Sequence, residues 1–299
     1  MTILIKNGRV IDPATKTDEV LDVLIEDGII VKKEKNSKAK ADKKIDATGC
    51  FVMPGFIDMH VHLRDPGFND KETVETGAQA AARGGYTTIF AMPNTRPVVD
   101  NADVVDYVQK KAQSLALVNV FQIGAVTKEQ KGEELADIEG MVKAGSPAIS
   151  EDGKTVMNSF LAREAMREAA RLNIPVLAHC EDAGLVRGGV VNADETTAKM
   201  GLKGIVNAAE NTIIARDIVL AQDTGARLHL CHCSTKESVA LVKHAKEEQA
   251  SVTAEVCPHH FTLTSDDIKE GDTNYKMSPP LRTRADVEAL RQGLKDDIM

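Results

Sequence analysis

Residues 54–67 read Pro-Gly-Phe-Ile-Asp-Met-His-Val-His-Leu-Arg-Asp-Pro-Gly, an apolar run that ends in two histidines spaced two apart. Residues 54–62 predict a strand. Side chains two apart on a strand point the same way, so His60 and His62 can both reach one metal ion. Either histidine alone could be a hydrogen-bonded core residue, so their meaning depends on what ends the strands further along the chain.

The sequence beyond this run alternates apolar, strand-like segments with amphipathic, helix-like segments. Further strands are predicted at 86–93, 118–126, 146–151, 174–180, 227–233 and 251–257, and helices at 71–83, 102–114, 133–143, 159–172, 205–223, 236–248 and 284–295. Such alternation predicts a parallel α/β sheet with right-handed crossovers. The seven strand–helix units are one fewer than a TIM-type (β/α)8 barrel contains. The low aromatic content of 3% suits the aliphatic core of such a barrel.

The first part of the chain is different, because it consists of short β-like runs around an Asp27-Gly28 turn signal. These runs, at 3–6, 8–11, 20–25, 28–31 and 45–52, cannot bury much surface alone. Residues 1–52 are therefore expected to be the N-terminal part of a small β-sandwich domain. Residues 53–299 are expected to form an incomplete, metal-dependent (β/α) barrel domain.

Three later predicted strands also end in residues that bind metals. Asp152 ends the fourth strand, His179 the fifth and His232 the sixth, and barrel enzymes build their active sites at this end of the strands. Four imidazoles and a carboxylate suit Zn²⁺ but are too many for one tetrahedral ion with an open position. Two ions that share Asp152 as a bridge fit better, and such a pair would acidify water and polarise a carbonyl group.

The other histidines and the cysteines favour a structural interpretation. His229 is expected to face away from His232 by strand alternation. One of His259 and His260, at the end of the seventh predicted strand, could line the pocket, but a packing or hydrogen-bonding role is the preferred interpretation. The cysteines near the predicted strand ends read as small core residues and not as ligands; they are Cys180, Cys231, Cys233 and Cys257.

Charge and composition exclude several classes of protein. The net charge is −8, and no Lys/Arg cluster is interleaved with aromatic residues, which argues against a nucleic-acid partner. No apolar run reaches the length of a membrane span, and residues 1–30 lack the apolar core of a signal peptide. Five cysteines, an odd number, favour free thiols in a reducing compartment, so a cytoplasmic location is expected.

The run 54–67 resembles the opening of the dihydroorotase and allantoinase branch of the amidohydrolase superfamily. Later motifs resemble the bacterial type I dihydroorotases in particular, and the resemblance covers essentially all 299 residues. These motifs are Ala-Met-Pro-Asn-Thr at 91–95 followed by Pro97, Cys-His-Cys-Ser-Thr-Lys at 231–236, and Lys-Met-Ser-Pro-Pro-Leu-Arg at 276–282.

The resemblance implies a two-zinc centre in each subunit. His60 and His62 would bind one ion, His179 and His232 the other, and Asp152 would bridge them.

It also implies a way of holding the substrate. Arg64 and Asn94 would bind the substrate carboxylate, for which the planar fork of arginine is suited. Ser278 stands where the family usually shows Asn, and it keeps a hydrogen-bonding group there.

The implied activity is the reversible cyclisation of N-carbamoyl-L-aspartate to L-dihydroorotate in pyrimidine (UMP) biosynthesis, by a zinc-activated hydroxide. A homodimer is implied as well, with aspartate transcarbamoylase as a candidate partner. The family's proton-transferring Asp belongs to an eighth-strand motif, expected beyond Met299. The chain is therefore expected to be C-terminally truncated, without its own catalytic Asp, and inactive or nearly so.

Two alternatives stay open. The first is another cyclic amidohydrolase, an allantoinase or hydantoinase, in which a carboxylated lysine would stand in the place of Asp152. The second is a catalytically silent homologue that serves as a structural partner of aspartate transcarbamoylase. The five candidate ligands argue against silence, because silent homologues usually lose them.

Overall fold

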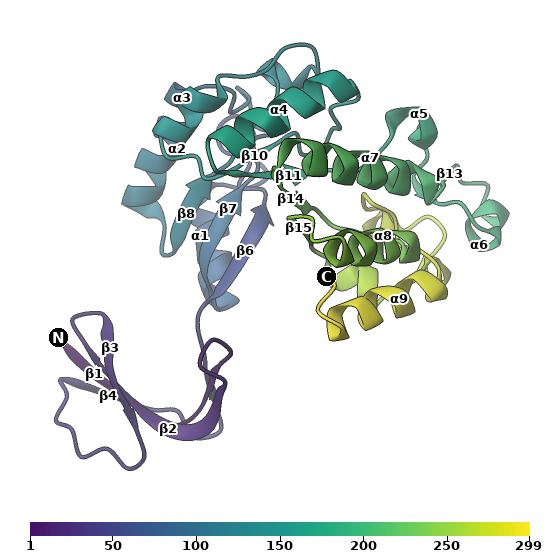
Figure 1. Ribbon diagram of the computed structural model, residues 1–299. Helices are drawn as coiled ribbons and strands as arrows, with labels where there is room; N and C mark the ends of the chain where they lie inside the picture. Colours follow the sequence, from purple (N-terminus) through teal and green to yellow (C-terminus); the bar gives the residue numbers. More distant parts are fainter. The chain divides into compact units, whose positions relative to one another are not determined.

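A computed structural model describes residues 1–299, and the chain divides into two compact units, Met1–Ile57 and Asp58–Met299 (Figure 1). Each unit is described by itself. No helix in either unit has the length and apolar character needed to cross a membrane.

The first unit is a five-stranded sheet built on β1. Its strands are β1 (Thr2–Asp12), β2 (Thr17–Glu26), β3 (Ile29–Glu34), β4 (Lys43–Asp46) and β5 (Phe51–Val52). β1 and β2 pair antiparallel, as do β2 and β3, whereas β4 and β5 both run parallel to β1. The predicted turn at Asp27-Gly28 is confirmed: both residues have positive φ, 48° and 84°, as a tight two-residue hairpin requires.

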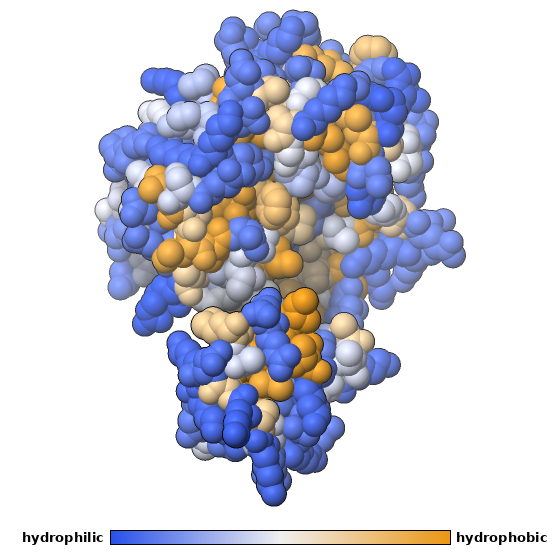
Figure 2. Space-filling model, turned by 90° about the vertical axis from the view of Figure 1, so that its left-hand side faces the viewer, coloured by the Kyte–Doolittle hydropathy of each residue, from blue (hydrophilic) through white to orange (hydrophobic).

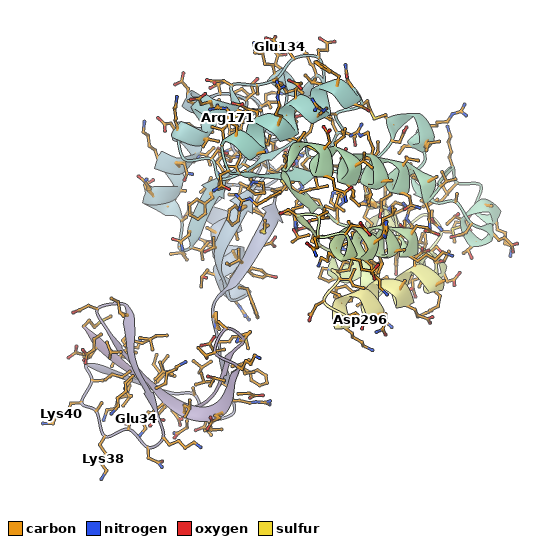
Figure 3. All side chains as sticks on the ribbon, in the orientation of Figure 1. Glu34, Lys38, Lys40, Glu134, Arg171 and Asp296 are labelled. Carbon is orange, nitrogen blue, oxygen red and sulfur yellow. The ribbon has the colours of Figure 1, made fainter.

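Much apolar surface of this sheet is solvent-exposed. Ile29, Ile30, Val31 and Phe51 are all exposed, and orange residues gather on the surface of this unit in Figure 2. The lysine-rich loop after β3 is solvated: Lys38 and Lys40 are exposed and extend away from the sheet in Figure 3.

The second unit contains a series of strands at the seven predicted positions, of which the first begins two residues before the unit does. The strands are β6 (Phe56–Val61), β7 (Tyr86–Ala91), β8 (Asn119–Gln122), β9 (Gly124–Ala125), β10 (Ile149–Ser150), β11 (Pro175–Ala178), β14 (Arg227–Leu230) and β15 (Val252–Ala254). They form two sheets, β6-β7-β8 and β15-β14-β11-β10-β9. Only Ile123 separates β8 from β9. The N–H of Ile123 donates to the carbonyl of Ala91 in the first sheet, and the N–H of Gly124 donates to the carbonyl of Ala148 beside the second, so the two sheets are continuous there.

Helices follow the strands in the expected alternation. They are α1 (Val74–Arg83), α2 (Ala102–Leu115), α3 (Ile138–Lys143), α4 (Ser159–Arg171), α7 (Ala208–Thr224), α8 (Lys236–Glu247) and α9 (Arg284–Lys295). Side-chain caps fix several starts: Thr73, Asn101, Asn158 and Thr235 each accept a hydrogen bond from a backbone N–H of the first turn.

The helix expected at 133–143 is shorter than its pattern suggested. It begins only after Asp137, whose carboxylate accepts the N–H of Gly140. The preceding residues are used otherwise, because Leu135 forms an isolated antiparallel bridge with Thr127. A short 3-10 helix, η1 (Lys128–Gln130), lies between these two residues.

A segment not anticipated by the alternation lies between β11 and α7. It contains α5 (Ala183–Val186), β12 (Val191–Asn192), α6 (Glu195–Lys199) and β13 (Gly204–Ile205). Its buried Val191 packs in a small apolar cluster with Ile268 and Leu281, which are distant in sequence.

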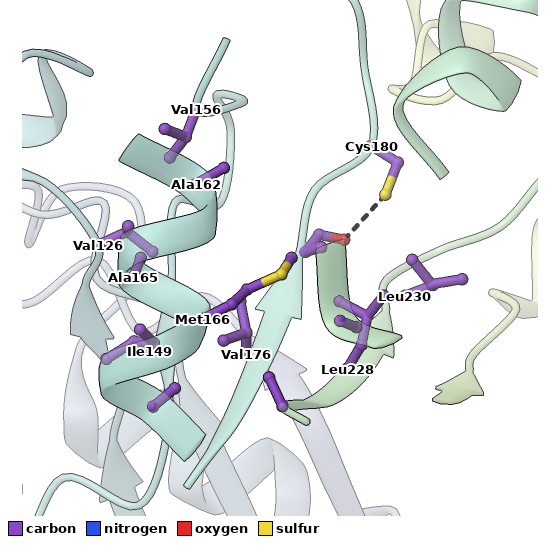
Figure 4. Close-up of a cluster of buried hydrophobic side chains, with 14 of the residues drawn as sticks. Val126, Ile149, Val156, Ala162, Ala165, Met166, Val176, Cys180, Leu228 and Leu230 are labelled. Carbon is purple, nitrogen blue, oxygen red and sulfur yellow. Dashed lines mark hydrogen bonds between the residues drawn. The ribbon is translucent and has the colours of Figure 1, made fainter. Parts of the chain in front are cut away.

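The main core lies between α4 and the strands β10, β11 and β14 (Figure 4). α4 presents Ala162, Ala165, Met166 and Ala169 to this core, all of them buried. Small side chains at these spacings let the helix approach the sheet closely, while aliphatic residues such as Val176 and Leu228 fill the space between. This packing fixes the strand ends from which the candidate site is built.

Candidate metal centre

Four of the five predicted metal ligands, all histidines, converge on the carboxylate of the fifth, Asp152. His60 is the last residue but one of β6, Asp152 follows β10, His179 follows β11 and His232 follows β14, so each comes from the carboxyl end of a strand. His60 Nε2 lies 3.2 Å from Asp152 Oδ1, and His62 Nε2 lies 3.5 Å from Oδ2.

The other two imidazoles approach the same carboxylate from β11 and β14. His179 Nδ1 is 3.6 Å and His232 Nε2 is 3.8 Å from Asp152 Oδ1. These two ring nitrogens face each other at 3.0 Å. The expected convergence is therefore observed, while the role of these residues as ligands and their division between two ions remain predictions.

The site is largely shielded from solvent, and this shapes its electrostatics. Burial raises the pKa of Asp152, but the imidazoles of His179, His232 and His60 that face its carboxylate outweigh burial and hold the pKa well below its usual range. For His60, burial lowers the pKa because it disfavours the charged imidazolium, but the hydrogen bonds to Asp152 and Glu255 outweigh burial and raise the pKa to about 10. For His62 burial prevails, and its pKa falls to about 4. An anionic carboxylate therefore lies among imidazoles of unequal basicity.

The outer nitrogens of two of these rings have fixed partners. His60 Nδ1 lies 3.0 Å from Glu255 Oε1, and His62 Nδ1 lies 3.1 Å from Asn94 Oδ1. Both partners can accept a hydrogen, so each Nδ1 can keep its proton when a metal ion takes the place of the hydrogen between His60 Nε2 and Asp152. Metal-binding histidines in proteins are usually oriented in this way.

Glu255 is the residue that the sequence interpretation missed. It directly follows β15, accepts the backbone N–H of His232 at 3.1 Å, and also lies 3.1 Å from His229 Nε2. A carboxylate at the end of a predicted strand was a usable signal, because the carboxyl ends of parallel strands meet. His229 is one of the partners of this carboxylate.

Asn94 and Gly153 pack closely beside the cluster. Asn94 Nδ2 donates to Asp152 Oδ2 at 3.0 Å, so this side chain connects Asp152 with His62. Gly153 has φ +79°, and a Cβ there would lie 3.2 Å from Asn94 Nδ2. The position after Asp152 therefore favours glycine, because the backbone has positive φ there and a side chain would crowd Asn94.

The other two predicted substrate residues differ in their surroundings. Arg64 is partly exposed, and its guanidinium forms no hydrogen bond within the protein. Burial is the main cause of the lowered pKa of His62; Asp152 opposes it, and the positive charges of His60 and Arg64 add to it. Ser278 instead donates to Glu181 at 3.1 Å, two residues after His179, and forms no hydrogen bond to the cluster.

Two candidate site residues adopt the left-handed backbone region, Arg64 with φ 58° and His232 with φ 37°. Such conformations cost about 1 kcal/mol or more and persist where the surroundings impose them. Around His232 the surroundings are clear: Glu255 accepts its N–H, and buried Glu210 accepts the N–H of Ser234 at 2.9 Å. Buried Arg282 donates to Ser234 Oγ at 3.0 Å and thereby supports the same loop.

Comparisons with known proteins agree with this geometry. The family described as Dihydro-orotase-like matches residues 49–238. A protein named dihydroorotase from Solibacter usitatus is 50% identical over 294 residues, which cover 98% of this chain and 68% of that protein. One of the same name from Acetivibrio thermocellus is 49% identical, with 98% of this chain and 69% of that protein covered.

The chain belongs to the dihydroorotase family. Solved structures extend the relationship to other cyclic amidohydrolases. An L-hydantoinase from Arthrobacter aurescens superposes with a TM-score of 0.86 at 25% identity, covering 99% of this chain and 67% of that chain. A D-hydantoinase from Thermus sp. superposes with a TM-score of 0.77 at 26% identity, covering 99% and 67%. The chain is thus a cyclic amidohydrolase of the dihydroorotase family.

Proposed function

We propose that this chain supplies the metal centre and substrate-binding residues of a dihydroorotase, which interconverts N-carbamoyl-L-aspartate and L-dihydroorotate. The observation that carries the proposal is the convergence of four imidazoles on Asp152, in a chain about half identical to named dihydroorotases. The same convergence argues against a silent structural homologue, because every candidate ligand is present and directed at one carboxylate.

The donor set fits zinc. Imidazole nitrogens and a carboxylate oxygen are ligands that Zn²⁺ prefers, and the cluster His60, Asp152 and His232 places one donor atom of each residue within 4.8 Å of the others. His60 and His62 would hold one ion, His179 and His232 the second, and Asp152 would contribute to both. When bound, such ions polarise a carbonyl group and lower the pKa of water.

The chain's own residues prepare the site for this chemistry. Glu255 and Asn94 orient the rings of His60 and His62, so that the Nε2 atoms of both rings face Asp152. The uncommitted guanidinium of Arg64 is suited to a carboxylate in two-point contact, which the ring carboxylate of dihydroorotate would supply. Asn94 and Ser278 would add hydrogen bonds to the same substrate, Asn94 from beside Asp152 and Ser278 from beside Glu181.

A hydantoinase-type activity is the second candidate, because hydantoinases are among the structural relatives. The position of Lys154 disfavours it. In those enzymes a carboxylated lysine would bridge the metals, but Lys154 Nζ donates to the backbone carbonyl of Gln130 at 2.7 Å. Asp152 instead occupies the centre of the imidazole cluster.

A substrate panel tests the proposal. Dihydroorotate, hydantoin and allantoin are offered to the zinc-loaded protein, with binding followed by calorimetry and ring opening by ultraviolet absorbance. Dihydroorotate should bind most tightly of the three, and any ring opening should be confined to dihydroorotate. Arg64→Met should weaken the binding of dihydroorotate about 10-fold or more, because a charged hydrogen-bonded contact is lost. Tighter binding of hydantoin or allantoin would favour the second candidate, and no binding of any of the three would refute both.

We further propose that the seven strand positions belong to a TIM-type (β/α)8 barrel and that residues 1–52 are part of a small β-sandwich domain. The contact of His60 at the end of β6 with Glu255 after β15 supports a curved sheet, since these are the two end strands of the series. An experimental structure of the zinc-loaded protein tests this, and a flat open sheet would contradict it.

The family resemblance also supports a cytoplasmic homodimer able to associate with aspartate transcarbamoylase. Light scattering after size-exclusion chromatography, with and without that enzyme, tests both associations. A strictly monomeric protein that co-elutes with nothing would contradict them.

A further inference from the structure

Cys257, His259 and His260 form a second cluster of metal-binding side chains. They lie just after β15, where η2 (Pro258–Phe261) turns the chain. One donor atom from each residue lies within 4.8 Å of those of the other two. The Asp152 centre uses none of these three residues. The sequence favoured a core position for Cys257 and packing or hydrogen bonding for the two histidines.

The ring of His260 is oriented as a metal ligand would be. Its Nε2 lies 2.9 Å from the backbone carbonyl of Pro279. A carbonyl oxygen can only accept, so Nε2 carries the hydrogen and a neutral ring has its lone pair on Nδ1. This is the arrangement in which metal-binding histidines donate their second N–H to a backbone carbonyl.

That lone pair has no partner in the protein. His260 is only 2% exposed, and its Nδ1 is buried without a hydrogen bond. A buried acceptor left unsatisfied costs about 1–3 kcal/mol. A bound cation would satisfy it, so the orphaned nitrogen is an independent indication of a ligand at this position.

The other two residues complete a reachable site. Cys257 and His259 are both partly exposed, so an ion can enter from solvent. The rings of His259 and His260 lie with centroids 4.2 Å apart at an interplanar angle of 60°. Zinc–sulfur and zinc–nitrogen bonds are about 2.3 Å and 2.0 Å long, so donors on one tetrahedral ion lie about 3.3–3.5 Å apart. The three donor atoms lie within 4.8 Å of one another, and side-chain rotations that draw them together would place them on one ion.

The charge around the thiol favours a cation as well. The carboxylates of Glu255 and Asp58 both act electrostatically on the Cys257 thiol, and their negative charge attracts a cation to this position. A bound ion would displace the thiol proton, as metal binding to cysteine generally does.

We propose that Cys257, His259 and His260 bind one Zn²⁺-class ion, separate from the Asp152 centre. One thiolate and two imidazoles form a donor set of the borderline-soft kind that selects zinc over magnesium or calcium. Three protein ligands leave a fourth coordination position for water or another small ligand. This site is independent of the proposed dihydroorotase activity.

Cobalt spectroscopy tests the proposal, because the ligands proposed for the Asp152 centre include no sulfur. Co²⁺ is titrated into metal-free protein carrying Cys50→Ser, which removes the exposed thiol of the first unit. A thiolate-to-cobalt charge-transfer band should develop and account for one equivalent of ion. Cys257→Ser should abolish this band and leave the visible bands of the histidine-bound cobalt unchanged.

Two further variants make the result decisive. Cys231→Ser is the matched control, because Cys231 lies near His60 and Glu255 and is the other thiol in a possible donor cluster; the band should persist in it. His259 is partly exposed, so His259→Ala should preserve folding. The cobalt affinity of the site that gives the charge-transfer band should fall about 10-fold or more in this variant. No band, a band lost with Cys231→Ser, or a band indifferent to His259→Ala would each overturn the proposal.

Discussion

The two halves of the Asp152 cluster are held in place by different means. The side chains of His60 and His62 on the β6 side are 10% and 30% exposed, and each ring is oriented by a side-chain partner. Those of His179 and His232 on the β11–β14 side are 7% and 9% exposed. They rely on the packed core beneath them and on the supported loop at His232.

This difference shows that a site can be preorganised through hydrogen bonds on one side and through packing on the other. Removing an orienting partner should affect mainly the first half. Disturbing the buried supports should affect mainly the second half and the stability of the fold. Among the five candidate ligands, Asp152 alone faces both histidine pairs, and Glu255 contacts both halves, through the His60 ring and through the backbone N–H of His232.

The largest effect is expected from Asp152→Ala. A structural zinc site with four ligands is worth about 10–16 kcal/mol, so one ligand contributes roughly 3 kcal/mol, or about 10²-fold in affinity. Because Asp152 faces both histidine pairs, both ions should be weakened, as measured by competition with a chromophoric chelator. Lys154→Met is the control and should leave both affinities unchanged. A loss of metal in the lysine variant with retention in Asp152→Ala would reverse the assignment of the bridge.

Arg282→Met should strongly destabilise the second unit. Arg282 is 2% exposed, donates to Asn192 Oδ1 and Ser234 Oγ, and lies 3.7 Å from the Glu210 carboxylate. Removing one partner of a buried ion pair typically costs about 3–5 kcal/mol, because the other charge is left buried. Urea unfolding measures this, with exposed Arg284→Met as a control expected to change stability by less than about 0.5 kcal/mol. Equal effects of the two substitutions would remove the role assigned to this network.

Glu255→Ala should weaken metal binding at the β6 half more than at the β11–β14 half. Loss of a partner that orients a metal-binding histidine usually costs about 10–100-fold in affinity. Glu255→Gln should cost less, since its amide oxygen can still accept from His60. Exposed Glu247→Ala provides the control, and metal titration by calorimetry provides the measurement. If the alanine variant binds both ions normally, Glu255 does not orient His60 for a metal.

The smallest expected effect concerns pH and Asp217, a buried residue of α7 beneath the β11–β14 half. Burial raises the pKa of Asp217 to about 6, although Arg216 opposes the shift. A carboxyl group with a raised folded-state pKa adds stability below its unfolded pKa and loses it as the pH rises through about 6. From pH 5 to pH 7 this residue should therefore remove about 1 kcal/mol from the free energy of unfolding.

Asp217→Asn should remove that pH-dependent component. The difference in unfolding free energy between wild type and variant should change by about this amount between pH 5 and pH 7, in favour of the variant at the higher pH. A difference that is constant with pH would mean that Asp217 does not titrate in this range.

The sequence predicted most of the strand and helix positions, because apolar periodicity reflects which faces become buried. It was wrong about the length of α3 and did not predict the small elements between β11 and α7. Neither is set by a long periodic pattern. A cap at Asp137 and a bridge at Thr127 decide where α3 begins. The small elements between β11 and α7 are stabilised by buried contacts of Val191 and Asn192 with residues about 80–90 positions away.

The chain's motifs alone determined the family, the alternating α/β organisation and the five residues around the candidate metal centre, since ligand types at successive strand ends are visible in the sequence. Only the tertiary structure showed that Glu255 and Asn94 orient two of the imidazoles, that Lys154 turns to the carbonyl of Gln130, and that His260 Nδ1 is left without a partner. The reason is physical. A residue type and its place on a strand are local properties, whereas a hydrogen-bond partner or an unsatisfied atom depends on which distant segments fold against it.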